Sequence, residues 1–303
     1  MKPNKRFEED RIFCWENETD TALPLMEFAG KHIPYAKVSD LKRWLKYGHF
    51  SVNGIVSTHV ATPVDPGALV EFNKTRPFVV FNNPRLKIVY EDDDIIVVNK
   101  GYGLLSVGTG SAKKEDTAYD ILKQYVKKKH PSNKIFVVHR LDRATSGLMM
   151  FAKSMEAQTA MQHNWNNMVL DRRYVAVCEG VMEETNGMIR SNLAETSQFE
   201  VYSSHDPFEG KQATTRYHVL QRGGGYTLVE FELETGRKNQ IRVHARDLGH
   251  PIAGDRKYGA KASPIQRLAL HARTLSFAHP ISRKLMKFEL PVPSRFAGLI
   301  KRR

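Results

Sequence analysis

Cysteine is scarce in this chain of 303 residues, which holds only Cys14 and Cys178. Two cysteines cannot build a disulfide framework, and their spacing fits no Cys/His zinc pattern. No run approaches the roughly 18 uninterrupted apolar residues of a membrane helix, and the first ten residues are charged without an apolar core. We therefore expect a cytoplasmic protein that is neither secreted nor inserted in a membrane.

Acidic side chains are outnumbered: 33 Asp and Glu stand against 46 Lys and Arg, which gives a formal net charge of +13 with neutral histidine. The first 80 residues carry a net charge of +1, and the remaining residues carry +12. Such a chain attracts polyanions. Nucleic acid is one candidate partner, and anionic membranes or plain solubility are the alternatives that charge alone leaves open.

Composition shifts and turn residues predict four segments. Residues 1–19 are rich in charge and lack apolar periodicity, so we expect a loosely ordered extension. Residues 20–73 show two helical patterns followed by a hairpin signal at Asn53-Gly54, which indicates a small α/β domain. Residues 74–86 hold two prolines and an Asn pair and are expected to form a linker, and residues 87–303 form the larger domain.

The larger domain is expected to be α+β, with a large mixed, mainly antiparallel sheet. The predicted strands are Lys87–Tyr90, Ile95–Asn99, Ile135–His139, Leu148–Ala152, Tyr174–Glu179, Thr214–Gln221, Tyr226–Glu234 and Leu268–Ala278. The predicted helices are Ala118–Lys129, Met155–Met168 with Ser154 as its cap, and Lys238–Leu248 ending at Gly249.

The segment "SDLKRWLKYGHFSVNGIV" and the following "PVDPGALVEF" resemble the S-four RNA-binding domain over residues 20–73. The resemblance implies phosphate contacts from one helix face that carries Lys37, Lys42, Arg43 and Lys46. An ordinary solvated helix face is the alternative. Members of that family commonly carry a Ser-Arg pair at the start of this helix, where this chain has Lys37-Val38-Ser39.

Asp142 lies in the segment "IFVVHRLDRATSGLMMFAKS", where a polar loop joins two apolar strands. It stands between Arg140 and Arg143. An aspartate held by one of these arginines, or by an arginine from elsewhere, would stay ionised as a nucleophile or base. The segment taken alone equally fits a turn aspartate that caps backbone amides.

The string His139-Arg140-Leu141-Asp142, followed by Thr145-Ser146-Gly147-Leu148, resembles the signature of the RluA-type RNA pseudouridine synthases. Four further blocks follow in the order of that family, and five ordered blocks over about 200 residues form a specific pattern. These four are "RRYVAVCEG" (172–180), "KQATTRYHVL" (211–220), "ETGRKNQIRVHARDLGHPIAGDRKYG" (234–259) and "LALHARTLSFAHP" (268–280).

The resemblance implies a cofactor-free isomerisation of uridine within RNA. Asp142 would attack the nucleoside or remove a proton, and which intermediate forms is left open. The target uridine must leave its stack, at a cost of a few kcal/mol. Tyr174 would pack on the extruded uracil, and the arginine at the position of Arg242 pairs with the catalytic aspartate in that family.

RNA contacts are expected from other basic residues of the motifs. Arg140 would contact or replace bases, and Arg237 and Lys238 would bind phosphate. Arg143 is a further expected RNA contact. Two positions depart from the family pattern: Asn239 stands where histidine is most frequent, and Gly101 follows Lys100 where proline is usual.

No Cys/His/carboxylate spacing indicates a metal, so His139, His244 and His250 are interpreted as structural. The acidic run 91–94 is interpreted as a solvated turn. We expect a monomeric enzyme that acts on ribosomal RNA, with transfer RNA as the second possibility. The alternative from another class is a non-catalytic RNA-binding or ribosome-assembly protein on the same fold.

Overall fold

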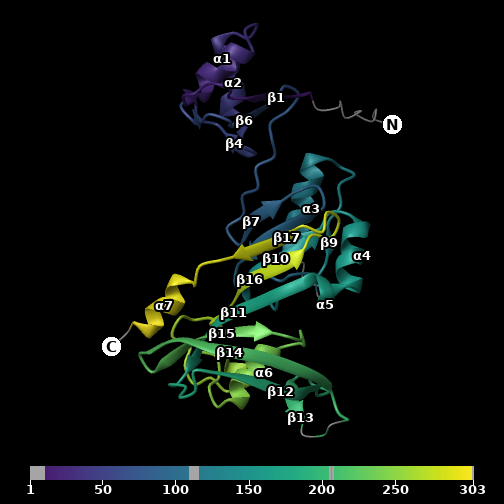
Figure 1. The fold of residues 1–303 in the computed structure, drawn as a ribbon, viewed down its shortest axis with the longest axis vertical. Helices are drawn as coiled ribbons and strands as arrows, with labels where there is room; N and C mark the ends of the chain where they lie inside the picture. Colours follow the sequence, from purple (N-terminus) through teal and green to yellow (C-terminus); the bar gives the residue numbers. More distant parts are fainter. Residues whose placement is uncertain (1–10, 109–115, 205, 207, 302–303) are drawn as a thin grey trace. The chain divides into compact units, whose positions relative to one another are not determined.

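The computed structural model describes residues 11–108, 116–204, 206 and 208–301, and the chain divides into two compact units, residues 1–80 and 81–303 (Figure 1). The division falls inside the segment expected to be a linker. Residues 74–85, all of which are described, carry neither helix nor strand, and Leu86 already begins a strand of the larger unit. None of the helices in the described ranges has the length and apolarity needed to cross a membrane.

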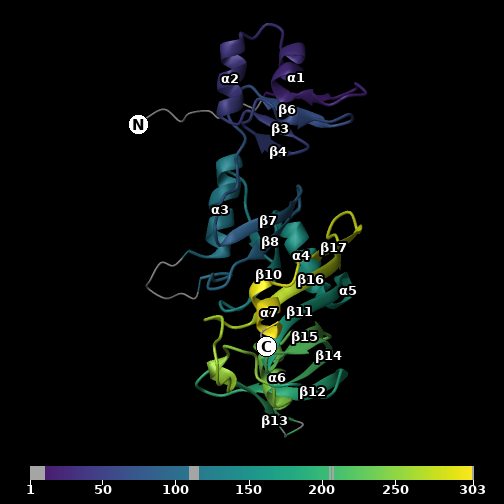
Figure 2. The same cartoon turned by 90° about the vertical axis from the view of Figure 1, so that its left-hand side faces the viewer.

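The smaller unit packs two helices on one face of a four-stranded antiparallel sheet of order β1-β6-β3-β4 (Figure 2). Leu25, Phe28 and Leu45 of the helices meet Phe50 and Phe72 of the sheet in a closed core. The elements are β1 (Ile12–Glu16), β2 (Leu23–Pro24), α1 (Leu25–His32), α2 (Val38–Lys46), β3 (Phe50–Val52), β4 (Ile55–Ser57), β5 (Pro63–Val64) and β6 (Leu69–Asn73).

Strand β1 corrects the expectation that residues 1–19 form a loose extension. Its residues pair antiparallel with β6, from Ile12 opposite Asn73 to Glu16 opposite Leu69. Phe13 and Trp15 share one face because side chains two apart on a strand point the same way. The Phe13 ring stacks on Trp15 at 5.9 Å and on Phe72 at 6.2 Å. Residues 1–10 of the expected extension lie outside the described residues.

The larger unit is built on one eleven-stranded sheet, which confirms the predicted α+β fold with a mainly antiparallel sheet. Nine strands follow the order β13-β12-β14-β15-β11-β16-β10-β8-β7, while β17 pairs with β16 and β9 with β10. The strands are β7 (Leu86–Glu91), β8 (Ile95–Lys100), β9 (Phe136–Val137), β10 (Ser146–Ala152), β11 (Val169–Glu179), β12 (Asn186–Glu195), β13 (Val201–Ser204), β14 (Lys211–Gly223), β15 (Tyr226–Leu233), β16 (Leu270–Ala278) and β17 (Leu285–Glu289).

The three predicted helical segments of the larger unit are present, the last of them beginning at Gln240 instead of Lys238, whereas the helix Ser294–Ile300 was not predicted. The predicted helix Met155–Met168 divides at Asn164 into two helices, and its cap is confirmed because the Ser154 hydroxyl accepts the Ala157 N–H at 3.1 Å. The helices are α3 (Ala118–Lys129), α4 (Met155–His163), α5 (Trp165–Met168), α6 (Gln240–Asp247), the 3₁₀ turn η1 (Arg256–Tyr258) and α7 (Ser294–Ile300).

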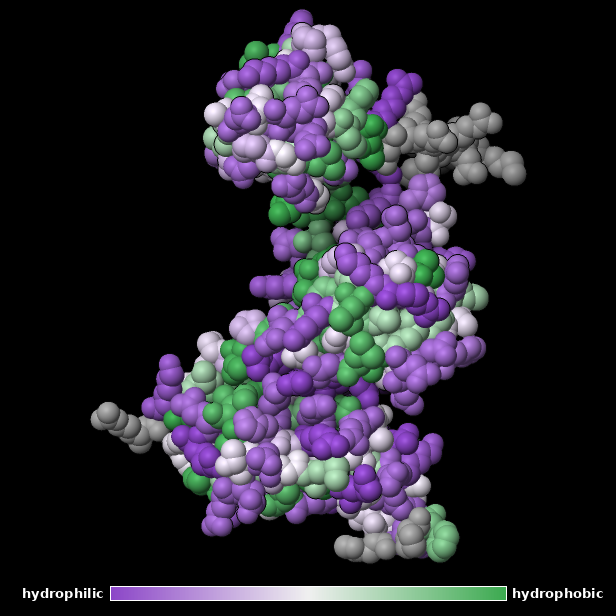
Figure 3. Space-filling model, in the orientation of Figure 1, coloured by the Kyte–Doolittle hydropathy of each residue, from purple (hydrophilic) through white to green (hydrophobic). Residues whose placement is uncertain are grey.

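Hydrophilic residues cover most of the visible surface (Figure 3).

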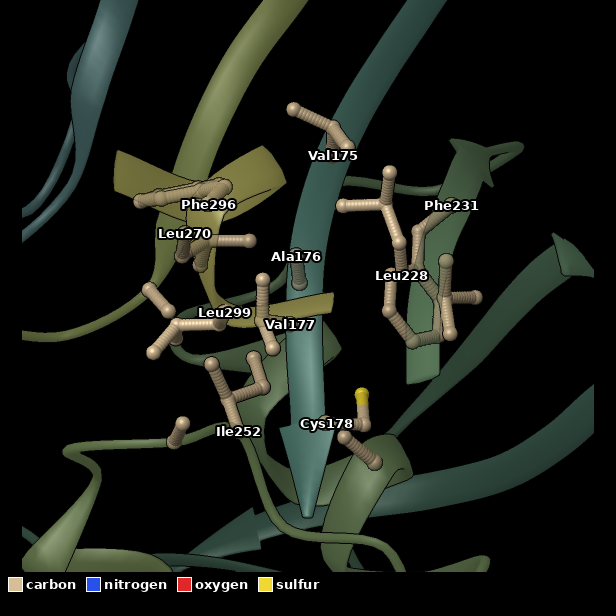
Figure 4. Close-up of a cluster of buried hydrophobic side chains, with 14 of the residues drawn as sticks. Val175, Ala176, Val177, Cys178, Leu228, Phe231, Ile252, Leu270, Phe296 and Leu299 are labelled. Atoms are coloured by element: carbon tan, nitrogen blue, oxygen red, sulfur yellow. The ribbon is translucent and has the colours of Figure 1, made fainter. Parts of the chain in front are cut away.

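The main core lies where β11, β15 and β16 meet α6 and α7. This cluster includes Val175 and Val177 of β11, Phe231 of β15 and Phe296 of α7 (Figure 4). Burial in this core raises the pKa of the Cys178 thiol to about 12, which leaves it protonated and unreactive.

Strand β16 ties together the two parts of the chain that carry Asp142 and Tyr174. It pairs antiparallel with β11, where Ala272 faces Tyr174, and parallel with the start of β10, where Ala272 faces Gly147. Gly147 has φ +117°, and a Cβ there would lie 2.1 Å from the Ala272 carbonyl oxygen. Only glycine allows this approach.

We predict that Gly147→Ala lowers the free energy of unfolding by roughly 3–5 kcal/mol, because the methyl group forces β10 away from β16 and the φ angle is unfavourable for alanine. Urea unfolding followed by circular dichroism measures this. Gly225→Ala is the control, since that glycine has φ +76° but no heavy atom lies within 4 Å of the place that its new methyl group would take. The control should cost only about 1 kcal/mol, and an equal loss in both variants would contradict the close-approach argument.

Candidate active site

A cavity of about 900 Å³ opens in the larger unit between the loop that precedes β10, strand β11, helices α4 and α5, and the start of α6. Six residues predicted from the sequence line it: Arg140, Asp142, Tyr174, Arg237, Lys238 and Arg242. Arg143 does not line this cavity, and its Nε donates to the Gly103 carbonyl oxygen at 3.2 Å. The remaining predicted residues, Lys37, Lys42, Arg43 and Lys46, are exposed on the smaller unit.

The backbone that carries Asp142 is fixed by hydrogen bonds while its side chain is exposed. The Leu141 N–H donates to the buried Ser106 hydroxyl at 3.1 Å, and the same hydroxyl donates to the Leu141 carbonyl oxygen at 2.6 Å. The Thr145 N–H donates to the Asp142 carbonyl oxygen at 3.0 Å. A carboxylate is thereby presented to the cavity from a rigid loop.

Tyr174 lies half-buried on β11 beside this loop. Burial raises the pKa of its phenol to about 12, although the nearby Arg172 cation opposes part of the effect. The ring therefore enters the cavity as a neutral phenol over the whole physiological pH range.

Arg242 corrects the expectation of a direct ion pair with Asp142. Its guanidinium grips Asp255 with two hydrogen bonds of 2.7 Å, and its Nη1 donates to the Asn239 side-chain oxygen at 2.9 Å. It also lies 4.7 Å from the centre of the Tyr258 ring. Among the described residues the bond with Asp142 is not formed, so Asp142 acts on Arg242 only through space.

Sequence reasoning missed Asp255 and Tyr258, which contact Arg242. Both are buried, and both lie in the stretch Gly254-Asp255-Arg256-Lys257-Tyr258-Gly259. An aspartate among basic residues is typical of a charged surface, and only the folded loop shows it enclosed against α6. Asn239, noted as a departure from the family pattern, takes φ +55° and also donates to the Tyr258 hydroxyl at 3.1 Å.

Gln240 shapes the segment that holds Arg237 and Lys238. Its buried side-chain oxygen accepts the Thr235 hydroxyl at 2.8 Å and the Arg237 N–H at 2.9 Å. Its amide group donates to the Thr214 carbonyl oxygen at 3.0 Å. Lys238 forms an ion pair with Glu195, so this cation has an internal partner that an external anion would have to displace.

The three histidines interpreted as structural each have a hydrogen-bond partner. His139 accepts the Met150 N–H at 3.0 Å, and burial followed by the charge of Arg172 lowers its pKa to about 3. His250 bonds the Glu179 carbonyl oxygen at 2.8 Å, and His244 bonds the hydroxyls of Thr215 and Ser191.

The acidic run 91–94 is more enclosed than the expected solvated turn. Glu91 accepts the Tyr125 hydroxyl at 2.7 Å and forms ion pairs with Lys129 and Lys153. Asp92 caps the turn and bonds His279 at 3.1 Å. Asp92, Asp94 and His279 bring potential ligand atoms within 4.8 Å of one another.

We predict that His244 makes the protein less stable as the pH falls from 6.5 toward 4. Burial lowers the pKa of His244 to about 4, so the unfolded chain binds the proton more readily than the folded one, and stability is complete only above pH 6.5. Urea unfolding over this pH range should show a slope that His244→Asn reduces by up to about 1.4 kcal/mol per pH unit. A His218→Asn control, at an exposed strand position, should keep the original slope.

Comparison with known proteins identifies the family. A sequence model of the family described as RNA pseudouridylate synthase matches residues 94–247, which is just over half of the chain. The chain is 34% identical over 281 residues to the ribosomal large subunit pseudouridine synthase D of Pasteurella multocida, covering 87% of this chain and 86% of that protein. It is 35% identical over 270 residues to an uncharacterized RNA pseudouridine synthase of Bacillus subtilis, covering 87% of this chain and 88% of that protein.

Solved structures share the fold. Human RNA pseudouridylate synthase domain containing 1 superposes with a TM-score of 0.55 at 25% identity, covering 70% of this chain and 86% of that chain. Human RNA pseudouridylate synthase domain containing 4 gives a TM-score of 0.57 at 24% identity, covering 69% of this chain and 90% of that chain. With these matches, the chain belongs to the RNA pseudouridine synthase family, as the RluA-type resemblance of its motifs predicted.

Proposed function

We propose that this enzyme isomerises uridine to pseudouridine in large-subunit ribosomal RNA, with Asp142 as the catalytic group. The observation that carries the proposal is that Asp142, Tyr174 and Arg242 line one cavity, although they come from a loop, a strand and a helix far apart in the sequence. The choice of RNA rests on relatives named ribosomal large subunit pseudouridine synthase D. Transfer RNA is the other candidate substrate.

The reaction exchanges one glycosidic bond for another within the same nucleotide. Asp142 attacks the nucleoside or removes a proton, so that the bond between N1 of uracil and C1′ of ribose breaks. The base turns, C5 bonds to C1′, the proton on C5 leaves, and N1 gains a proton. The atoms of substrate and product are the same, so we expect no cofactor.

Tyr174 and the exposed basic residues would receive the extruded nucleotide. A stacked uridine must leave the helix at a cost of a few kcal/mol, which contacts in the cavity have to offset. The neutral Tyr174 ring provides a surface on which uracil can pack. Arg140 at the cavity would contact the bases left behind, and Arg143, Arg237 and Lys238 would contact the RNA backbone.

Arg242 would act as a fixed positive charge near Asp142. Its contacts with Asp255 and Asn239 hold the guanidinium in place before RNA arrives. A charge that is already positioned need not reorganise during the reaction, which is how preorganised electrostatics lowers a barrier.

The smaller unit would add RNA affinity as an S-four-type module. The basic side chains of α2 are exposed, and their helix is amphipathic, with Leu41 and Leu45 buried on the opposite face. Two linked modules that bind one RNA raise each other's effective concentration. We also expect the enzyme to work as a monomer in the cytoplasm.

We predict that Asp142→Asn lowers the rate of pseudouridine formation by roughly 10³-fold or more, because the amide can neither attack nor take the proton. RNA affinity should stay within about twofold of wild type, since the side chain is exposed and the change is isosteric. Single-turnover conversion of ribosomal RNA transcripts and a binding titration measure the two quantities. Asp116→Asn, at an exposed aspartate outside the cavity, is the control that should keep full activity.

Equal activity in wild type and Asp142→Asn would contradict the assigned catalytic group. Tight RNA binding by wild-type protein without any conversion would instead favour the non-catalytic scaffold.

We predict that the double variant Lys42→Gln, Lys46→Gln weakens RNA binding and leaves the rate constant of bound RNA unchanged. Each lost phosphate contact should reduce the slope of log affinity against log salt by about 0.7 for single-stranded RNA, so the double variant should lose about 1.4. Binding titrations between 50 and 200 mM salt measure this. Lys31→Gln on α1, whose charge is paired with Glu27 at 3.0 Å, should keep the wild-type slope.

A further inference from the structure

Arg172 is a cavity arginine to which the proposed mechanism gives no role. It lies on β11 two residues before Tyr174, so both side chains point to the same face of the strand. Both line the cavity. The residue between them, Arg173, points to the opposite face.

Arg172 is half-buried, and few interactions fix the position of its guanidinium. Its one described hydrogen bond is a long one, from Nη2 to the Leu233 carbonyl oxygen at 3.4 Å. The Trp165 ring centre lies 5.8 Å away. Within the described parts of the chain, no carboxylate oxygen lies within 4.0 Å of Arg172.

The charges of two other arginines, Arg173 and Arg242, are neutralised by carboxylates of the protein. Arg173 pairs with Asp171 at 3.0 Å and with Glu230 at 3.2 Å. Arg242 pairs with the buried Asp255. Both of these arginines therefore form ion pairs with carboxylates of the protein, whereas Arg172 does not within the described residues.

The surroundings of Arg172 suit an anion. Burial lowers the pKa of Arg172 below its ordinary value, although the group stays a cation. A partly desolvated cation without a counter-ion is costly, and a bound anion removes that cost. The nearby His139 is kept neutral by burial and so carries no charge of its own toward an anion.

The shape of the pocket adds a second constraint. Gly236 packs directly against the guanidinium, since a Cβ at that position would lie 2.7 Å from Nη1 of Arg172. The Trp165 ring also lies near this guanidinium, with its centre 5.8 Å from Cζ. A guanidinium edge matches two oxygens of a phosphate group.

We infer that Arg172 forms a phosphate-binding site inside the active cavity, and that it takes a backbone phosphodiester next to the extruded uridine. The inference rests on the proposed function, because RNA supplies the phosphate. Tyr174, the proposed platform for uracil, is two strand residues away, about 7 Å. One nucleotide can therefore place its base on Tyr174 while an adjoining phosphate contacts Arg172.

The first experiment compares the full-length wild type with Arg172→Gln, Arg172→Lys and Arg173→Gln, using a large-subunit ribosomal RNA fragment that wild type converts. Affinity is measured between 50 and 200 mM salt. Arg172→Gln should reduce the slope of log affinity against log salt by about 0.7. Arg172→Lys keeps the charge and should recover the slope. Arg173→Gln removes a charge that carboxylates already neutralise, so it should keep the wild-type slope.

The second experiment locates the phosphate. Single uncharged methylphosphonate linkages replace the phosphodiesters around the target uridine one at a time. With wild-type protein, one linkage adjoining the target should weaken binding, and with Arg172→Gln the same linkage should cause no further loss. Thermal unfolding of each variant checks that the fold is kept.

Three results would overturn the inference: an unchanged slope in Arg172→Gln, an equal loss of slope in Arg173→Gln, or additive effects at every linkage. A lower rate of conversion at an unchanged slope would assign Arg172 to a neutral group of the base and would also overturn it. If wild-type protein converts no large-subunit RNA, the proposed function is wrong. If wild-type protein converts this RNA but Arg172→Gln leaves the salt slope unchanged, only the inference about Arg172 is wrong.

Discussion

The contact between Gly147 and Ala272 is the constraint on which the site depends. It lets β10 and β16 run side by side with no side chain between them. Because β16 also pairs with β11, one strand fixes the distance between the loop of Asp142 and the ring of Tyr174. The Ser106 hydroxyl then locks the loop from its other side. The geometry of the cavity is therefore set by backbone packing, and the side chains proposed for the chemistry need not be buried to be well placed.

The cations of the cavity fall into two classes that the fold treats differently. Arg242 and Lys238 have carboxylate partners within the protein, whereas Arg172 is left with a carbonyl oxygen. An arginine that is paired with a carboxylate provides a charge in a constant position. An arginine without such a partner has N–H groups that can donate to a ligand. The net charge of +13 attracts RNA in general, and a cation that already has a carboxylate partner must give up that contact before it can bind a phosphate.

The sequence was informative where function depends on contiguous residues. The loop of Asp142, Tyr174 and the helix of Arg242 could be located because each lies in a short motif with its own strand or helix pattern. Contacts between residues that are distant in the sequence could not be predicted from such motifs. Asp255 is the partner of Arg242, for example, and no local pattern marks it as buried. Strand β1 was hidden for the same reason, since its apolar alternation covers only five residues and is completed by β6. Strands β12, β13 and β17 were missed because neighbouring strands supply most of their burial and order.

The pairing of β1 with β6 has a mechanical consequence. Ile12 lies opposite Asn73, and the Lys74 N–H donates to the Arg11 carbonyl oxygen at 3.0 Å, so the chain enters and leaves the smaller unit at the same end of one antiparallel pair. A force that pulls residue 11 and residue 74 apart would therefore break the hydrogen bonds between β1 and β6 one after another, starting at this end of the pair, and not all at once. A pull on this module would therefore separate the edge strand β1 from β6 first.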